Sequence, residues 1–567
     1  MPYRRYAPAW LLASTLLLLV AIAPSRGAQP GAGSSFAPFD AASGAAAVPG
    51  TAGDPLTPGS AGTAAAAAPG TTAGAPGSTG GGATGSQTGV SAGSGAAPGA
   101  APAGAAGGDT SHCRDGKQFA LAGFVAAPPC QPTFTGGDNG GATYPGVTKT
   151  SISVVYYRVK QNAAVQGALG STGVQPTPAQ LDAFLTAEAA FISKRYELWG
   201  RKLEIAVYES PSCQASPPSD DCFRQDARAL IAKHKPFAVI FPQNGTTPGF
   251  QDELSKAGVV NFGGLGLPGS FNTSRRPFRY DHTMDGDTQA TLTGEFYCKR
   301  LANAKAAYAG DAALRGQARK ALILVPDSEF TVAAAQRLQS VINRCDKVGA
   351  TIKTYAQDTS QAASQSTTLA SQAKQSGITT ILWFTDPVLP IFLTPQMTSQ
   401  NFFPENVTVG TNFLDYDPLA QLYDQQQWAN AFGLGNLAES QDPKKQDAYA
   451  AYRDGGGSGE PYISADGAQG YFSILAAGIQ QAGARLDPGT FERGVLTLPA
   501  YGGDRFHSRI DFGPGDYTGQ SDARVTYWDP DATSPINGER GAYVPLDGGR
   551  RYGIGQFPTS ALQVPRS

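Results

Sequence analysis

The chain has 567 residues, 41% of them hydrophobic, and a formal net charge of −2 at pH 7. Its length exceeds that of one ordinary domain, and its apolar content suffices for more than one buried core. The near-neutral charge excludes the basic face that nucleic-acid binding requires, so no nucleic-acid partner is expected.

The N-terminus has the features of an export signal. Two arginines precede an apolar run at 11–23, and small residues follow it. This pattern predicts a signal peptide over 1–27 and an extracellular, cell-surface or periplasmic location. A membrane span needs about 20 apolar residues, so a longer reading of the run over 7–24 leaves an uncleaved anchor as the alternative. No cysteine precedes Cys113, and the lipid anchor of a lipoprotein is therefore not predicted.

A segment of low complexity comes next. Residues 28–110 are almost wholly Gly, Ala, Pro, Ser and Thr. Such a composition cannot bury enough apolar surface to offset the entropy lost on ordering, which predicts a disordered linker. The linker contains GVSAG at 89–93, which matches the G-x-S-x-G pattern of a hydrolase nucleophile. That pattern needs a preceding strand and a following helix, so we interpret this match as chance.

All six cysteines lie beyond the export signal, which is typical of disulfides in an oxidising compartment. Their spacing favours three local pairs, although the sequence permits others: Cys113 with Cys130, Cys213 with Cys222, and Cys298 with Cys345. The first pair would close an N-terminal extension over 111–145. The histidines lack metal-ligand spacing and there is no C-x-x-C motif, so neither a metal nor another cofactor is expected.

Predicted strands and helices alternate from residue 146 onward. The first set comprises strands at 151–157, 201–210, 237–241 and 259–262, and helices at 178–200, 220–235 and 249–256. The first of these helices carries its large apolar residues on one face: Leu181, Phe184, Leu185, Phe191 and Ile192. Glu188 is the one polar interruption of that face. Thr177 before a proline predicts where the helix starts, and Gly200 predicts where it ends.

A second set of elements has the same rhythm. It comprises strands at 320–326, 350–356, 379–384 and 406–413, and helices at 331–349, 361–377 and 388–400. Short strands separated by helices are typical of parallel sheets with right-handed crossovers. The predicted fold class is therefore α/β, with two doubly wound parallel-sheet lobes preceded by the disordered tether.

The loop after the strand at 237–241 is the first candidate site. Ligands of open parallel sheets bind beyond the carboxyl ends of the strands. This strand is followed by amide, hydroxyl and glycine residues: Gln243, Asn244, Gly245, Thr246 and Thr247. Helix capping alone is the simpler explanation. Free N–H groups at the positive end of the next helix would also suit a ligand carboxylate or another anion, and we predict ligand contacts here.

The glycine-rich loop after the next strand is the second candidate. GLGLPG at 264–269 matches the G-x-G-x-x-G pattern of dinucleotide-binding loops. That fingerprint opens a helix directly, whereas Pro268 interrupts this one, so no nucleotide is predicted. Gly263 and Gly264 would instead let the backbone approach a ligand.

Strand ends in the second set supply the opposite side of the predicted cleft. They carry Phe330, Asp386, Asp415 and Tyr416. Aspartates at such positions are commonly helix caps. Across a cleft from an anion site, Asp386 or Asp415 could also receive an ammonium group, and Phe330 or Tyr416 could pack on the substrate.

The order of several motifs resembles that of the type I periplasmic solute-binding proteins, which include the branched-chain amino-acid receptors of ABC transporters. The motifs are GVTKTSISV, FAVIFPQNGTTPGF, RPFRYDHTMDGDTQ, ALILVPDSEFTVAAAQRL and RIDFGPGDYTGQSDARVTYW. The resemblance implies a non-catalytic solute-binding domain over 146–567 whose two lobes are joined by three crossing segments. Lobe 1 would span about 146–285 plus 460–510, and lobe 2 about 300–455 plus the C-terminal segment.

The resemblance also implies site residues. The family's first-lobe contacts carry over to the loop from Gln243 to Thr247 and to Gly263 through Leu265. Where the amino-acid receptors commonly have serine, or paired alanine and threonine, this chain has Asn244, Thr246 and glycines. An amino acid is therefore one option among small polar or anionic solutes.

The resulting hypothesis is an exported, monomeric receptor that traps a small polar or anionic, amino acid-like solute for an ABC permease or a membrane sensor. Two alternatives stay open. A secreted surface or cell-wall protein could keep the fold without a transport role. A secreted hydrolase would need a nucleophile, a base and an orienting group at strand ends, and the sequence offers no recognisable set.

Overall fold

The computed structural model describes residues 108–159, 169–211, 213, 219–242, 247–358, 360–410 and 413–565. The predicted signal peptide and nearly all of the predicted linker lie outside the described residues. The site residues Gln243, Asn244, Gly245 and Thr246 also lie outside them. Among the helices that the structure does describe, none combines the length and the apolar character of a membrane span.

The first sheet has five parallel strands in the order β2-β1-β3-β4-β5. The strands are β1 (Ser151–Arg158), β2 (Lys202–Glu209), β3 (Ala238–Phe241), β4 (Val260–Gly263) and β5 (Arg279–Tyr280). Successive side chains of a strand point to opposite faces. In β1, Ile152, Val154 and Tyr156 enter one core, whereas Val155 and Tyr157 enter another. Both faces of this sheet are therefore buried, as the apolar strand runs predicted.

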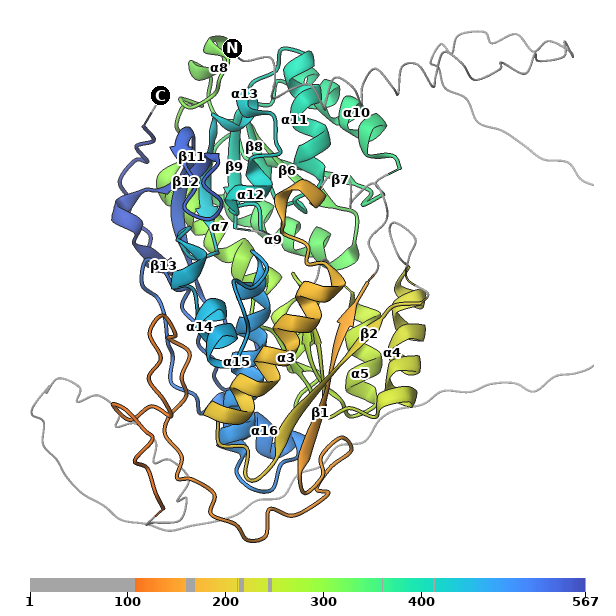
Figure 1. The fold of residues 1–567 in the computed structure, drawn as a ribbon. Coiled ribbons are helices and arrows are strands. Elements are labelled where there is room, and N and C mark those ends of the chain that lie inside the picture. Colours follow the sequence, from red (N-terminus) through yellow and green to blue (C-terminus); the bar gives the residue numbers. More distant parts are fainter. Residues whose placement is uncertain are drawn as a thin grey trace, which may run out of the picture. The chain divides into compact units, whose positions relative to one another are not determined.

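Helices cover both faces of the first sheet (Figure 1). One core includes residues of α3 (Pro178–Arg195), α14 (Asp447–Asp454), α15 (Ala465–Ala482) and α16 (Pro488–Leu496). The other includes residues of α4 (Asp220–His234) and α5 (Pro248–Lys256). Residues of α14 fall in the range expected for lobe 2, but the helix packs against α3 in the first core.

Helix α3 starts where the sequence predicts and ends earlier. Thr177 accepts a hydrogen bond from the backbone of Gln180, whose side chain accepts one from the backbone of Thr177. This reciprocal pair is a capping box. The predicted end at Gly200 is wrong, because Tyr196 leaves the helix in an extended conformation. The ring centroid of the buried Tyr196 is 5.3 Å from that of Phe119 in the N-terminal extension. The residues around Tyr196 in the sequence give no indication of this long-range contact.

The second sheet is parallel at its centre and antiparallel at one side. Its main path runs β12-β11-β10-β9-β8-β6-β7, and β13 pairs with β11. The strands are β6 (Ala321–Pro326), β7 (Ala350–Tyr355), β8 (Thr380–Trp383), β9 (Glu405–Val409), β10 (Ala431–Gly435), β11 (Asp522–Thr533), β12 (Arg540–Pro545) and β13 (Arg551–Gly553). The prediction of a parallel sheet is confirmed for β6 to β9. β10, which was not predicted, pairs parallel with β9. The C-terminal strands β11 to β13 pair antiparallel, which the sequence did not indicate.

The second sheet also has a helix layer on each face (Figure 1). In β6, Ile323 and Val325 enter a core with α7 (Gly286–Arg300) and α9 (Glu329–Cys345). Leu322 and Leu324 enter a second core with α10 (Ala362–Gln375), α11 (Leu389–Ser399), α12 (Asp417–Ala420) and α13 (Gln425–Trp428). Two further short helices are α6 (Gly269–Thr273) and α8 (Ala312–Arg315).

Three segments connect the elements of the first sheet with those of the second. They follow β5, β10 and α16, at 281–285, 436–446 and 497–521. The first and third segments are hydrogen-bonded, since the Asp281 N–H donates to the Tyr517 carbonyl at 2.9 Å and the Gly519 N–H donates to the Asp281 carbonyl at 2.9 Å. The second and third meet where the Ser508 hydroxyl donates to the Asn436 carbonyl at 2.9 Å. The crossing segments therefore lie side by side.

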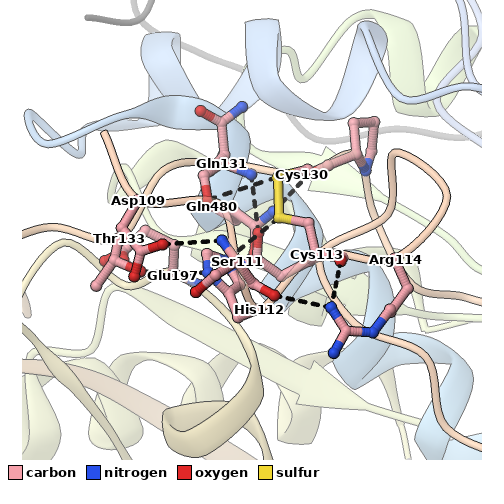
Figure 2. The surroundings of a disulfide bond; sticks show 12 residues. Asp109, Ser111, His112, Cys113, Arg114, Cys130, Gln131, Thr133, Glu197 and Gln480 are labelled. Atoms are coloured by element: carbon pink, nitrogen blue, oxygen red, sulfur yellow. Dashed lines mark hydrogen bonds between the residues drawn. A yellow bond between two sulfur atoms is a disulfide. The ribbon is translucent and has the colours of Figure 1, made fainter. Parts of the chain in front are cut away.

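The N-terminal extension packs on the first core (Figure 2). Cys113 and Cys130 form a disulfide, and the Gln131 N–H donates to the Gln118 side chain at 2.8 Å. Gln480 of α15 donates to the Pro129 carbonyl at 2.8 Å. Together with the buried Phe119 and Phe124, these bonds make the extension part of the first core.

The cysteines pair as their spacing favours: Cys113 with Cys130, Cys213 with Cys222, and Cys298 with Cys345. The last pair ties α7 to α9 across a sequence separation of 47. Replacing Cys298 and Cys345 together with serine should lower the free energy of unfolding by about 4 kcal/mol, because the unfolded chain regains the entropy of that loop. Urea denaturation measures the loss. Replacing Cys113 and Cys130 should cost less, since their separation is 17, and the opposite order would contradict the loop-entropy account.

Candidate functional site

A cavity of about 510 Å³ is lined by residues from both sheets. Its lining includes residues that follow the carboxyl ends of parallel strands: Val159 after β1, Leu265 after β4, Gln357 after β7, Asp386 after β8 and Phe413 after β9. Open α/β sheets bind ligands beyond these strand ends. The volume falls in the usual range for small-molecule sites, roughly 300–1,000 Å³.

The described part of the first predicted loop does not support an anion site. Thr247 lines the cavity, but it is buried and its hydroxyl donates to Gln251 at 2.9 Å. At the N-terminus of α5, the Gly249 N–H donates to the Asp220 carboxylate at 2.7 Å. Asp220 therefore already occupies part of the positive helix end that was expected to attract a ligand anion.

The predicted glycine contacts are replaced by a backbone role. Gly263 and Gly264 are not among the residues that line the cavity, whereas Leu265 is. Gly263 has φ +105°, and a Cβ there would lie 1.8 Å from the Phe241 carbonyl oxygen. Only glycine fits this close approach of backbone to backbone at the end of β4. The expectation of ligand contact at Gly263 and Gly264 therefore receives no support from the cavity.

Phe330 lies outside the cavity lining. It is half-buried near the start of α9, and its ring centroid is 5.7 Å from that of Phe271 in α6. The prediction that Phe330 packs on a solute is not supported, because its ring is engaged with another aromatic residue.

Asp386 lines the cavity but is hydrogen-bonded on both carboxylate oxygens. Oδ1 accepts the N–H groups of Val388 and Leu389 at 2.8 and 3.1 Å. Oδ2 accepts the Tyr355 hydroxyl at 2.5 Å and the Gln357 amide at 3.1 Å. Asp386 therefore holds the backbone turn that leads into α11, and its capacity for a ligand is limited.

Asp415 and Tyr416 also line the cavity. Asp415 is 1% exposed and accepts the Leu437 N–H at 3.0 Å, with Arg524 at 3.5 Å. Burial raises the pKa of Asp415 and the Arg524 charge lowers it, with burial the larger effect. The Tyr416 hydroxyl donates to the Ile463 carbonyl at 2.9 Å, a bond from the second-sheet side to the segment before α15. Burial raises the pKa of Tyr416, so this hydroxyl stays protonated.

The N-termini of α14 and α15 contribute residues that sequence reasoning missed. Asp447, Asp466 and Gln469 line the cavity, and Asp447 accepts the Val125 N–H of the N-terminal extension at 2.9 Å. Burial, followed by the Asp466 charge, raises the pKa of Asp447 to about 8. A usable signal was present, because the polar residues at 466, 469 and 473 lie three or four positions apart and so share one face of a largely apolar helix.

The described lining of the cavity has acidic side chains but no lysine or arginine. The six carboxylate residues are Asp358, Asp386, Asp415, Glu439, Asp447 and Asp466. Two of these have a cationic partner behind the lining, Arg505 for Glu439 and Arg524 for Asp415. The arrangement differs from the anion-binding cleft that the sequence led us to expect.

The comparison with protein families decides the identification. The model of a family described as periplasmic binding protein matches residues 186–533. The chain belongs to the periplasmic binding protein family. The two-sheet topology of this periplasmic binding protein agrees with the type I arrangement that its motifs resembled. A comparison with curated proteins gives no significant match.

Solved structures are similar to this chain, and the one from R. palustris has the same fold. A solute-binding protein of an ABC transporter from R. palustris, in complex with 4-hydroxybenzoate, has 14% sequence identity and a TM-score of 0.50, covering 71% of this chain and 97% of that one. A branched-chain amino acid transporter substrate-binding protein from Streptococcus pneumoniae, in complex with isoleucine, has 14% identity and a TM-score of 0.47, covering 70% and 100%. A branched-chain amino acid ABC transporter protein from Thermus thermophilus, with bound valine, has 10% identity and a TM-score of 0.47, covering 72% and 97%.

Proposed function

We propose that this periplasmic binding protein is an extracytoplasmic receptor that captures a small solute between its two sheets and presents it to an ABC permease or a membrane sensor. The proposal rests on one observation. Residues that follow strand ends of the first sheet and of the second sheet line the same cavity. A solute that touches both sides favours the closed arrangement, so closure is a population shift driven by binding. The disulfides fit an oxidising compartment outside the cytoplasm.

The solute is taken to be small and polar, with an apolar part. The cavity volume fits a molecule of the size of an amino acid or a hydroxybenzoate, which similar structures bind. Aromatic residues supply much of the wall, including Tyr156, Phe413, Tyr416, Tyr462 and Phe506. The absence of lysine and arginine from the described lining gives no support to the anionic part of the earlier hypothesis.

Replacing Tyr416 with alanine should weaken solute affinity about tenfold or more, because it removes an aromatic wall and the bond to Ile463 across the cavity. Isothermal titration with amino acids, aromatic acids and amines measures affinity, and small-angle scattering of the same samples measures compaction. Tyr449→Ala is the matched control, since Tyr449 lies in α14 outside the cavity lining. A solute that binds without compaction, or Tyr416→Ala with unchanged affinity, would contradict closure around this cavity.

A receptor and a surface protein of the same fold differ in one respect that can be measured. Replacing Asn244 and Thr246 with alanine should reduce solute affinity in a receptor, whereas a surface or cell-wall protein has no solute affinity to lose. The wild-type protein measured against the same panel provides the reference.

A further inference from the structure

One carboxylate of the cavity has an oxygen left open. Asp466 lies in the first turn of α15, and its Oδ1 accepts the Ala448 N–H at 3.2 Å. No described residue bonds to its Oδ2. Asp466 is surrounded by protein, yet its side chain is accessible because it faces the cavity. A ligand in the cavity can therefore reach this oxygen.

Some buried oxygens of the lining residues have no hydrogen-bond donor, whereas the buried donors of the described lining all have an acceptor. Three buried lining residues have an oxygen without a hydrogen-bond partner among the described residues: Asp415 Oδ1, Asn436 Oδ1 and Gln469 Oε1. Gln469 is 1% exposed, and its amide nitrogen donates to Glu188 at 3.0 Å, which fixes the direction of the oxygen. No buried donor of the described lining is left without a partner. Buried polar groups are normally hydrogen-bonded. These three oxygens are enclosed by protein and have almost no surface in the cavity, so the accessible acceptor that the cavity offers a ligand is the Asp466 carboxylate.

Two carboxyl groups interact at this end of the cavity. The Asp466 charge helps raise the pKa of Asp447, and neither carboxylate forms an ion pair with a described lysine or arginine. Their neighbours in the lining are His507 and the partly buried Tyr501. Burial raises the pKa of Asp466, and the Ala448 N–H and the His507 charge oppose that rise. His507 is itself paired with Asp504. A cation placed beside the two carboxyl groups would favour their ionised forms and so oppose the effect of burial on their pKa values.

Aromatic rings lie close to Asp466. The Phe413 ring lies 3.8 Å from the position of a Cβ on Gly467, the residue after Asp466. The ring centroids of Phe413 and Tyr416 are 6.4 Å apart, and the Asp466 charge contributes to the raised pKa of Tyr416. A carboxylate beside two aromatic rings is a favourable environment for an ammonium group, which gains both an ion pair and cation–π contacts.

We propose that the solute carries a protonated amine, which binds Asp466 beside Phe413 and Tyr416, and that it carries no net negative charge. Its apolar part occupies the remaining aromatic and aliphatic wall. This inference rests on the proposed receptor function, and it specifies the chemical class of the solute. It also reverses the sign of charge that the strand-end loop had suggested.

The test compares two probes that share a phenylethyl body and differ in the sign of charge. Phenethylamine and 3-phenylpropionate are titrated separately into the full chain by calorimetry. We expect phenethylamine to bind and 3-phenylpropionate not to bind. Asp466→Asn should weaken amine binding about tenfold or more, whereas Asp182→Asn, an exposed position on α3, should leave it unchanged.

A second variant covers the case in which Asp466→Asn does not fold. Phe413→Leu keeps an apolar side chain and removes the ring, and it should weaken amine binding roughly threefold. Binding of 3-phenylpropionate in preference to phenethylamine would overturn the amine proposal and leave the receptor function standing. Equal amine affinity of wild type and Asp466→Asn would also overturn it. Failure of both probes and of the wider solute panel would overturn the receptor function together with the amine site.

Discussion

Replacing Glu405 with alanine is expected to lower the free energy of unfolding by about 3–5 kcal/mol. Glu405 starts β9 in the second sheet and is fully buried. Its two oxygens accept the Arg319 guanidinium at 2.8 and 2.9 Å, and they also accept the Thr380 hydroxyl at 2.8 Å and the Tyr308 N–H at 3.0 Å. Without Glu405, the buried Arg319 charge loses its counterion while it stays out of water.

The loss of stability in Glu405→Ala should come from the Arg319 charge that is left buried without a counterion, and not from the net contribution of the Arg319–Glu405 ion pair. The double variant Arg319→Met with Glu405→Ala should therefore recover part of the loss. Glu460→Ala is the control, since Glu460 and its partner Lys444 are both about half exposed at the surface, and it should change stability by less than about 1 kcal/mol. Urea denaturation monitored by circular dichroism measures all three. A loss below about 1 kcal/mol for Glu405→Ala would contradict this account of the second core.

Replacing Glu188 with glutamine is expected to stabilise the protein at pH 8 by up to about 4 kcal/mol and to have little effect at pH 5. Glu188 is fully buried between α3 and α15, and Gln469 donates to its Oε1 at 3.0 Å. Burial raises the pKa of Glu188 to about 8 from an ordinary value of 4.5. The carboxyl is thus protonated in the folded protein across a range where the unfolded chain has it ionised.

The direction of the pH effect on stability follows from this difference in the pKa of Glu188 between the folded and the unfolded protein. A group whose pKa is raised on folding contributes stability below its unfolded pKa, and this contribution is lost as pH rises through the folded pKa. Glutamine resembles the protonated carboxyl and cannot ionise, so the stability difference between Glu188→Gln and wild type should grow from pH 5 to pH 8. Thermal unfolding across this range measures it, with Asp182→Asn on the exposed face of α3 as control. A difference independent of pH would show that Glu188 is ionised in the folded state.

Much of the fold could be predicted from local patterns. The apolar runs that became β1, β3, β6 and β8 are buried on both faces, and such runs are typical of parallel strands between helix layers. Thr177 marked a helix start because its side chain satisfies a backbone group a few residues away. The three disulfides followed from spacing for a similar reason, since each links segments close in sequence.

The candidate site was predicted less well. Asp386, Asp415 and Tyr416, named from strand ends, line the cavity, as does Leu265, which the family resemblance implied; their contact with a solute stays a prediction. The strand-end rule could not tell which carboxylates are already satisfied, and Asp386 proved to hold the backbone turn that leads into α11. It also missed Asp466, because α15 comes almost two hundred residues after the strands it packs on and its first turn carries no strand-end signal.

The sequence by itself determined most of the parallel strands, the places where their helices begin, and the two disulfides of short separation, because each of these depends on residues near one another in the chain. Only the tertiary structure decided that α14 packs with the first core, that C-terminal strands complete the second sheet, and that carboxyl side chains without a described lysine or arginine line the cavity. The sign of charge in a cavity depends on which side chains from distant segments face it and which of those are already paired, and no local pattern carries that information.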